Sequence, residues 1–163
     1  MEDFVTLDDI KAARDRIKSA ARYTPLIDAP WPTLAPQAPK APLALESLWL
    51  KAENLQPMGA FKIRGAFNMI SQLPHDSMGR GVITYSSGNH GQAVAMAART
   101  LGIPAVIVMP TTAPQVKVDG CKSYGAEVIM EGTTSLERQR RADQEAAARG
   151  LTMVPPFDHK QII

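Results

Sequence analysis

Short apolar runs alternate with stretches of helical spacing in the second half of the chain. The apolar runs cover residues 82–85, 105–108, 127–130 and 152–154. The stretches between them have the helical spacing of apolar positions and cover about 90–101, 114–124 and 135–149. Short buried strands that alternate with helices are typical of βαβ units, which build a parallel sheet with right-handed crossovers. The pattern therefore predicts an α/β fold.

A glycine follows each of these predicted helices. Gly102, Gly125 and Gly150 stand at the three helix ends, and the next apolar run begins two or three residues later. Glycine favours the left-handed backbone conformation that commonly follows the last helical turn. The glycines thus mark where each helix stops and the chain turns back to the sheet.

The first part of the chain is less regular. Thr6 and Asp9 have the spacing of a capping box, with aspartate in place of the usual glutamate, and an amphipathic helix is predicted over about 7–21. Residues 29–42 contain five prolines, too many for regular structure, and are predicted to form a surface loop. Two further elements are predicted before residue 82: a strand over 48–51 and a helix over about 60–73.

Composition and charge argue against several classes of protein. With 163 residues, 45% of them hydrophobic, the chain is long enough for a buried core, and no apolar run is long enough to span a bilayer. The acidic start, Met1 to Phe4, does not resemble a signal peptide. The net charge of +2 is mixed along the chain, and the basic run at 137–141 is expected to form a solvated helix face. Neither nucleic acid nor a membrane is therefore expected as a partner.

A lysine between two glycines is the first candidate for chemistry. Lys62 lies between Gly59 and Gly65, near the start of a predicted helix and directly after Phe61. A lysine amine forms an imine with an aldehyde when it is unprotonated, and burial lowers the pKa of a lysine. Gly59 would allow close approach of the backbone, and Phe61 could pack beside a ring. Taken alone, such a residue is more often a solvated helix lysine.

A polar loop between a predicted strand and a predicted helix is the second candidate. Its sequence is Ser86-Ser87-Gly88-Asn89-His90-Gly91-Gln92. In α/β folds such loops lie at the carboxyl edge of the sheet, where ligands bind, and the amides at a helix start favour an anion. The first three residues could wrap a substrate carboxylate, and Asn89 can donate to the phenolic oxygen of a pyridoxal ring. A polar turn with a serine cap is the alternative.

Three other residues are not assigned to a site. Cys121 lies in a predicted helix and is expected to be a small core residue; as a single cysteine it excludes an internal disulfide and fits a reducing cytoplasm. His75 stands in a Pro-His-Asp turn, and His159 has no partner at metal-ligand spacing, so no metal site is predicted. The chain has neither a Gly-x-Gly-x-x-Gly sequence nor a Walker-type loop, so dinucleotide and nucleoside triphosphate binding lack support.

The two candidate segments together resemble one enzyme family. Residues 51–66 resemble the cofactor-lysine region of the serine/threonine dehydratases, a branch of the fold-type II pyridoxal phosphate enzymes that includes serine racemase. The loop from Ser86 resembles the substrate loop of this family, and His90 distinguishes it from cysteine synthases, which typically carry threonine there. Three later segments match as well: 109–117, 124–128 and 156–158. The resemblance runs from about Tyr23 to Ile163 and covers only the first half of such a protein.

The resemblance implies roles for individual residues. Lys62 corresponds to the catalytic lysine that joins the cofactor, pyridoxal 5′-phosphate, and Phe61 to the neighbour that contacts the cofactor ring. Asn89 corresponds to the residue that reaches the ring hydroxyl. Ser87 corresponds to the acid/base on the second face in serine racemases and is the other predicted catalytic residue. The substrate carboxylate is expected to be bound by five loop residues: Ser86, Ser87, Gly88, Asn89 and His90.

The resemblance also implies a fold and a division into domains. The fold is the three-layer αβα arrangement of fold-type II enzymes, similar to tryptophan synthase β, with the parallel βα units incomplete here. Residues 1–54 would belong to a large cofactor domain, 55–155 mostly to a small domain with the parallel sheet, and 156–163 to the start of the return. Lys62 would lie at the domain interface. The family's glycine-rich phosphate loop and the residue that contacts the pyridine nitrogen fall outside these 163 residues.

The implied activity is elimination of water from L-threonine or L-serine, giving a 2-oxo acid and ammonia. The full-length parent would then be a cytoplasmic ammonia-lyase and a homo-oligomer that acts on a small amino acid. A serine racemase or a hydroxyaspartate dehydratase on the same scaffold is the first alternative. The second is a truncated homologue that binds without turnover, and the isolated 163-residue chain is expected to be inactive.

Overall fold

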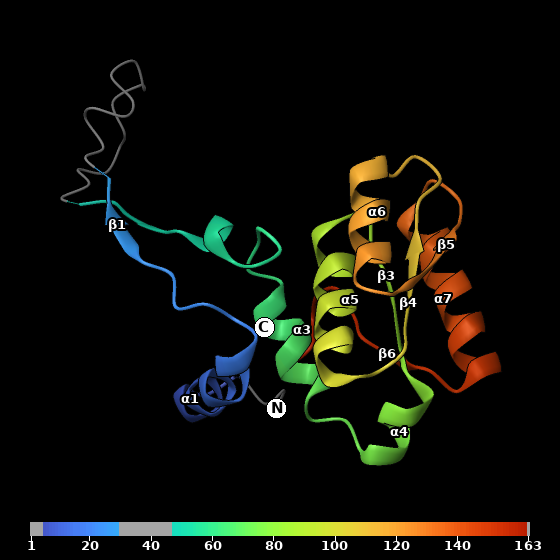
Figure 1. Ribbon diagram of the computed structural model, residues 1–163, viewed down its shortest axis with the longest axis horizontal. Coiled ribbons are helices and arrows are strands. Elements are labelled where there is room, and N and C mark those ends of the chain that lie inside the picture. Colours follow the sequence, from blue (N-terminus) through green and yellow to red (C-terminus); the bar gives the residue numbers. More distant parts are fainter. Residues whose placement is uncertain (1–4, 30–46, 163) are drawn as a thin grey trace.

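A computed structural model describes residues 5–29 and 47–162, which form an N-terminal region and an α/β unit (Figure 1). The N-terminal region begins with α1 (Leu7–Arg16) and the 3₁₀ turn η1 (Ile17–Ser19). Strand β1 (Leu26–Asp28) then pairs antiparallel with β2 (Trp49–Lys51) in a two-stranded ribbon that extends away from the α/β unit. The predicted proline-rich loop at 29–42 lies, apart from Ala29, outside the described residues.

The start of α1 confirms the predicted capping box. The Thr6 hydroxyl accepts from the Asp9 N–H at 3.2 Å, and the Asp9 carboxylate accepts from the Thr6 N–H at 2.9 Å. The predicted helix over 7–21 is, however, two elements, because regular α-helix stops at Arg16 and continues as η1. The apolar Ile17 is buried at that change of geometry.

The α/β unit is built on a four-stranded parallel sheet in the order β5-β4-β3-β6. Its strands are β3 (Val82–Tyr85), β4 (Ala105–Met109), β5 (Glu127–Met130) and β6 (Thr152–Met153). The helices between them are α5 (Asn89–Leu101), α6 (Gln115–Ser123) and α7 (Ser135–Arg149). The predicted alternation of strands and helices, and with it the α/β fold class, is confirmed.

Helices cover both faces of the sheet and give three layers. Alternate strand residues point to opposite faces: Val82 and Ile107 pack with α5, whereas Ile83 and Val106 pack with the α7 residue Ala142. Figure 1 shows α5 and α6 on one face and α7 on the other. The right-handed crossover rule accounts for this, since the chain moves outward from β3 to β5 and then returns across β3 to β6.

Along the chain, two helices follow the N-terminal region and precede the first strand of the sheet. Helix α3 (Ile63–Ile70) packs on α5, whose buried face is rich in alanine and so allows close approach. It is shorter than the predicted 60–73, because the regular helix begins at Ile63, directly after its N-cap Lys62, and ends at Ile70. Helix α4 (His75–Arg80) was not expected, since a six-residue helix with no buried side chain carries no hydrophobic period.

The glycines after the helices have the expected conformation. Gly102, Gly125 and Gly150 have φ of 69°, 83° and 65°, in the left-handed region that favours glycine. The strand order reverses at β3, which has β4 on one side and β6 on the other. Because β3 and β6 pair in parallel, both end at the same carboxyl edge of the sheet, where ligands of open α/β sheets bind.

Candidate active site

Lys62 lies at this carboxyl edge, where it contacts the segment that follows β6. It is the N-cap residue of α3, its side chain is half-buried, and Nζ donates to the Pro156 carbonyl at 2.8 Å. The Phe61 ring centre lies 5.3 Å from Nζ, and 56% of Phe61 is exposed. The predicted pair is thus adjacent in space as well as in sequence, with the aromatic ring available to a ligand.

Phe61 and Lys62 line a pocket of about 610 Å³. Its other walls include Ile10 and Ile17 from the first helical segment and Phe157 from the chain after β6. Small-molecule sites commonly enclose roughly 300–1,000 Å³, with mostly apolar walls and a few polar groups. The volume of the pocket suits a molecule of the size of pyridoxal phosphate. The Lys62 amine suits its aldehyde, and the exposed Phe61 ring suits its aromatic ring.

The loop after β3 presents free backbone donors. Gln92 is the first amide of α5 that bonds back along the chain, to the Gly88 carbonyl at 3.2 Å. The amides of residues 89–91 precede it and have no partner within the helix, because the first turn of any α-helix leaves such donors free. The Ser86 hydroxyl accepts from the Gly88 N–H at 3.2 Å, and Ser87 is exposed. This geometry suits the predicted binding of a carboxylate.

Gly91 brings this helix start close to the sheet. A Cβ atom at Gly91 would lie 2.8 Å from Ile107 Cγ2 and 3.4 Å from Ser86 Cβ. The distance to Ile107 is shorter than van der Waals contact allows, so α5 reaches its position because residue 91 has no side chain. The glycine thereby sets where the free amides point.

Asn89 is held by a lysine that the sequence analysis did not assign. Lys117, on α6, donates from Nζ to Asn89 Oδ1 at 2.7 Å and to Gln92 Oε1 at 3.3 Å. Because the ammonium takes the carbonyl end of the Asn89 amide, the NH₂ end is the free donor. That orientation agrees with the predicted donation from Asn89 to a ring oxygen, which remains a prediction.

The His90 side chain points inward rather than toward the loop. Nε2 lies 3.3 Å from the Val154 carbonyl, and since a carbonyl only accepts, Nε2 carries the hydrogen. Burial lowers the pKa of His90 to about 4, which leaves the ring neutral near pH 7. Nδ1 is buried, has no hydrogen-bond partner among the described residues, and in this tautomer can only accept. What His90 can offer a carboxylate is therefore its backbone N–H.

The segment at 154–156 is where the two predicted halves of the site meet. His90 bonds to its first residue and Lys62 to its last. The loop residues from Ser86 to His90 do not belong to the lining of the Lys62 pocket. In the sequence, residues 156–158 stand out only as a segment that resembles the family. A carbonyl contact of this kind uses a backbone atom that every residue has, so no side-chain signal could have indicated it.

Two other residues that the sequence singled out, Cys121 and Arg138, are buried. Cys121 is fully buried, and burial raises the pKa of its thiol to about 11. The expectation of a solvated face at 137–141 is wrong for Arg138, which is buried and donates to the Thr133 carbonyl and the Ser135 hydroxyl.

The described residues contain no cluster of three or more histidine, cysteine, aspartate or glutamate side chains that could hold a metal ion. Within the same residues, none of the helices combines the length and apolar character that crossing a bilayer requires.

Comparisons with known proteins cover nearly the whole chain. The family model described as "Pyridoxal-phosphate dependent enzyme" matches residues 17–163. Serine racemase of Schizosaccharomyces pombe is 42% identical over 158 residues, which are 97% of this chain and 46% of that protein. Catabolic L-threonine dehydratase of Staphylococcus aureus is 42% identical over 159 residues, covering 98% of this chain and 44% of that enzyme.

Solved structures give the same result. Maize serine racemase superposes with a TM-score of 0.86 at 34% identity, covering 98% of this chain and 46% of that one. Such neighbours are fold-type II pyridoxal phosphate enzymes, as the sequence resemblance implied. The chain spans about half the length of the relatives it matches.

Proposed function

The chain belongs to the family of pyridoxal-phosphate dependent enzymes, and from that membership we propose that it supplies the lysine and the substrate loop of a threonine/serine dehydratase. The reaction is elimination of water from L-threonine or L-serine. The observation that carries the proposal is the meeting of Lys62 and the loop after β3 at residues 154–156. A dehydratase and a racemase are both 42% identical to this chain, so sequence identity does not choose between the two reactions. We propose the dehydratase reaction.

Pyridoxal phosphate is the cofactor of this family. When bound, it supplies an aldehyde that condenses with amines and a ring that accepts electron density from the substrate α-carbon. Lys62 would hold it covalently, Phe61 would pack against the ring, and the free NH₂ of Asn89 would donate to the ring oxygen. Lys117 keeps that NH₂ turned outward.

Lys62 is also the proposed proton carrier. Its amine ends a four-carbon chain from the start of α3, and among the described residues its one hydrogen-bond acceptor is the Pro156 carbonyl. Once displaced by the amino group of the substrate, the neutral amine can remove the proton from the α-carbon and later deliver a proton to the leaving β-hydroxyl. Half-burial in an apolar pocket limits competition from water.

The loop after β3 would orient the substrate. The free amides at 89–91 and the hydroxyl of Ser86 can receive the carboxylate, with the positive end of the α5 dipole behind them. With the substrate nitrogen held as well, holding the carboxylate fixes rotation about the N–Cα bond and so directs the Cα–H bond toward the Lys62 amine. The buried His90, bonded to Val154, keeps the helix start in place.

The proposed reaction balances without a further reagent. The Cα–H and Cβ–O bonds break and a Cα=Cβ bond forms, which releases water. The enamine then gains a proton at Cβ and loses one from nitrogen, so that the Cα=Cβ bond becomes a Cα=N bond. Hydrolysis of this Cα=N bond takes up one water and releases ammonia. The net change converts a β-hydroxy amino acid to a 2-oxo acid and ammonia, with no oxidant or reductant.

Borohydride trapping tests the assignment directly. The protein that carries this chain is incubated with pyridoxal phosphate, reduced, digested and mapped by mass spectrometry, and ammonia release from L-threonine is measured in parallel. We expect the label on Lys62, and loss of both label and ammonia release in Lys62→Ala. A label on another lysine, or ammonia release that survives the substitution, would refute the proposal. Amino-acid binding without ammonia release from the unsubstituted protein would favour a homologue without turnover.

Racemisation is the second candidate function. Ser87 is exposed at the loop, where a hydroxyl could act on the face of the substrate opposite Lys62, and the Schizosaccharomyces pombe relative is a serine racemase. Chiral analysis of serine after incubation with the protein separates the two reactions. If racemisation occurs, Ser87→Ala should remove formation of D-serine while ammonia release continues.

The remaining assignments concern the whole protein. We propose that residues 55–155 belong mostly to a small domain and the flanking residues to a larger cofactor domain. We further propose a homo-oligomeric, cytoplasmic enzyme; the single cysteine, which cannot form an internal disulfide, fits a reducing compartment.

A further inference from the structure

Lys62 lies in a loop whose two ends are joined by an ion pair. Glu53 and Arg64 stand 11 positions apart, with Lys62 between them. Arg64 donates from Nε to Oε2 and from Nη2 to Oε1 of Glu53, each at 2.8 Å. Inside the loop Gly59 has φ of 77°, and its N–H donates to the Gln56 carbonyl, so the chain turns sharply before Lys62. The pair therefore closes the loop that carries the amine.

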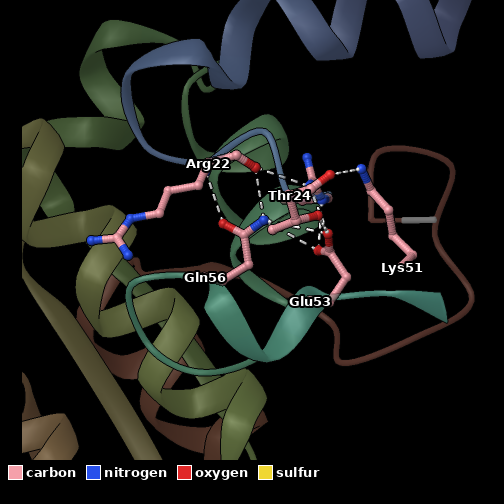
Figure 2. A network of polar contacts seen from close by, with 6 residues as sticks. Arg22, Thr24, Lys51, Glu53 and Gln56 are labelled. Carbon is pink, nitrogen blue, oxygen red and sulfur yellow. Dashed lines mark hydrogen bonds and ion pairs between the residues drawn. The ribbon is translucent and has the colours of Figure 1, made fainter. Parts of the chain in front are cut away.

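The same carboxylate is tied to the chain that precedes β1. Figure 2 shows Glu53, the first residue of η2 (Glu53–Leu55), beside Thr24 of this segment and Gln56, which follows η2. The hydroxyl of the buried Thr24 donates to Glu53, and Gln56 Nε2 lies 3.3 Å from Oε2. The buried Gln56 amide also pairs with Arg22, accepting from its N–H and donating to its carbonyl, both at 2.9 Å. Three separate segments thus converge on one carboxylate.

This ion pair differs from an ordinary surface pair. The Glu53 and Arg64 side chains are 19% and 32% exposed, and their two parallel hydrogen bonds fix both planes. Hydrogen bonding from Arg64 lowers the pKa of Glu53 to about 2, so the carboxylate stays charged across the physiological range. Exposed single pairs hold geometry poorly because solvent screens them. A bidentate, half-buried pair with additional donors can fix a loop.

We propose that Glu53 is a positioning residue for Lys62, acting through the clamp with Arg64 to set where the amine lies. This rests on the proposed role of Lys62. The amine has one hydrogen-bond acceptor at its far end, Pro156, and the clamp lies two residues from its backbone. Glu53 touches neither the amine nor the pocket. Glu53 would act by fixing the position of Lys62. That position matters because a small displacement of a reacting group slows a reaction strongly.

The clamp has a matched control elsewhere in the fold. Glu127, on β5, also accepts two hydrogen bonds from one arginine, Arg149, at 3.0 and 2.8 Å. That pair joins β5 to α7 and includes no residue of the Lys62 pocket. Glu53→Gln and Glu127→Gln each replace a doubly bonded carboxylate by an amide of the same shape. Comparing them separates a local effect on Lys62 from a general loss of stability.

The test measures the reactivity of Lys62 without cofactor. Cofactor-free protein is treated with trace acetic anhydride well below its unfolding midpoint, and the labelling rate of Lys62 is compared with that of the exposed Lys18 by mass spectrometry. In Glu53→Gln we expect the relative rate of Lys62 to rise about fivefold, because a released amine loses its fixed contact and becomes accessible. In Glu127→Gln it should stay unchanged.

The outcomes separate this inference from the proposed function. An unchanged Lys62 rate in Glu53→Gln, or an equal rise in both variants, would overturn the positioning role. If Glu53→Gln does not fold, Arg64→Lys replaces it with the same expected direction, since lysine keeps the charge but cannot form the fork. Borohydride trapping of pyridoxal phosphate on Lys62 of the unsubstituted protein tests the proposed function independently of the labelling rates.

Discussion

His90 donates from Nε2 to the Val154 carbonyl at 3.3 Å and thereby joins the start of α5 to the segment that follows β6. Two residues later, the carbonyl of Pro156 accepts from Lys62. The helix that begins with the predicted substrate loop and the helix that begins after the predicted cofactor lysine are thus both bonded to one short piece of chain. Substitutions at these contacts should reveal how the site is held together.

The buried His90 predicts a loss of stability in mild acid. Burial lowers the pKa of His90 to about 4, and the nearby Lys62 charge acts in the same direction. An unfolded histidine takes up its proton near pH 6.5, so between pH 6.5 and 4 the unfolded chain binds more protons and stability falls as pH falls. Urea unfolding at pH 6.5 and 5 should show a loss of about 2 kcal/mol from this group.

Two variants check that assignment. His90→Asn cannot titrate in this range and should lose most of the pH dependence, whereas the same change at the exposed His75 should keep it. Glu53 does not interfere, because its carboxylate, with a pKa of about 2, weakens the fold only below about pH 4.5. A pH dependence that is identical in His90→Asn and the unsubstituted protein would show that another group is responsible.

A methyl group at Gly65 should destabilise the protein. Its Cβ would lie closer to the Ile162 carbonyl oxygen than any van der Waals contact permits, and a backbone atom cannot rotate away. We expect Gly65→Ala to lower the free energy of unfolding by about 1–3 kcal/mol, the usual cost of overpacking. Gly79→Ala is the control, because a Cβ there meets nothing within 4 Å. In α4, where Gly79 lies, alanine should raise the free energy of unfolding by about 0.5–1 kcal/mol, because it is a better helix former than glycine.

Loss of the Lys117 amine should weaken substrate use. Without its hydrogen bond, Asn89 is free to rotate and no longer presents a fixed NH₂ donor. We expect Lys117→Met to raise the KM for the amino acid about tenfold, the scale of one hydrogen bond to a charged group. Lys122→Met, an exposed change on the same helix, should leave the KM unaltered. Equal KM values in both variants would mean that Asn89 needs no support.

Cys121 should be chemically inert in the folded protein. It is fully buried, and burial raises the pKa of its thiol to about 11, so almost no thiolate forms at pH 8. Reaction with a disulfide reagent at pH 8 should be slower by about a hundredfold or more than in urea-unfolded protein. Rapid reaction under native conditions would contradict the observed burial.

The elements with a strong hydrophobic period were predictable from the sequence. The strands at 82–85, 105–108 and 127–130 and the helix at 135–149 agree with the structure to within a residue, because each has a clear apolar run or helical period. Two elements without a buried side chain, β1 and α4, were missed. All three residues of β1 are exposed, and what makes it a strand is its partner β2, more than 20 positions away.

The predicted site shows the same division. Its chemistry was visible locally, since an amine beside an aromatic ring and a polar turn at a helix start are properties of short segments. Its supports were not, because Pro156 and Val154 contribute backbone carbonyls, and Glu53 and Lys117 act across 11 and 28 positions. Arg138 was misjudged for a related reason: a guanidinium can be buried when neighbouring oxygens accept its hydrogens.

By itself, the sequence determined the α/β class, the order of strands and helices from residue 82 on, and the residue types that match the pyridoxal phosphate family. These depend on periodicity and on neighbouring residues, which a linear pattern contains. Only the tertiary structure decided that Lys62 and His90 meet at one backbone segment, that Gly65 faces a carbonyl oxygen, and that Glu53 closes the loop around Lys62. Those contacts join positions far apart along the chain, and only the packing of α3, α5 and β6 brings them together.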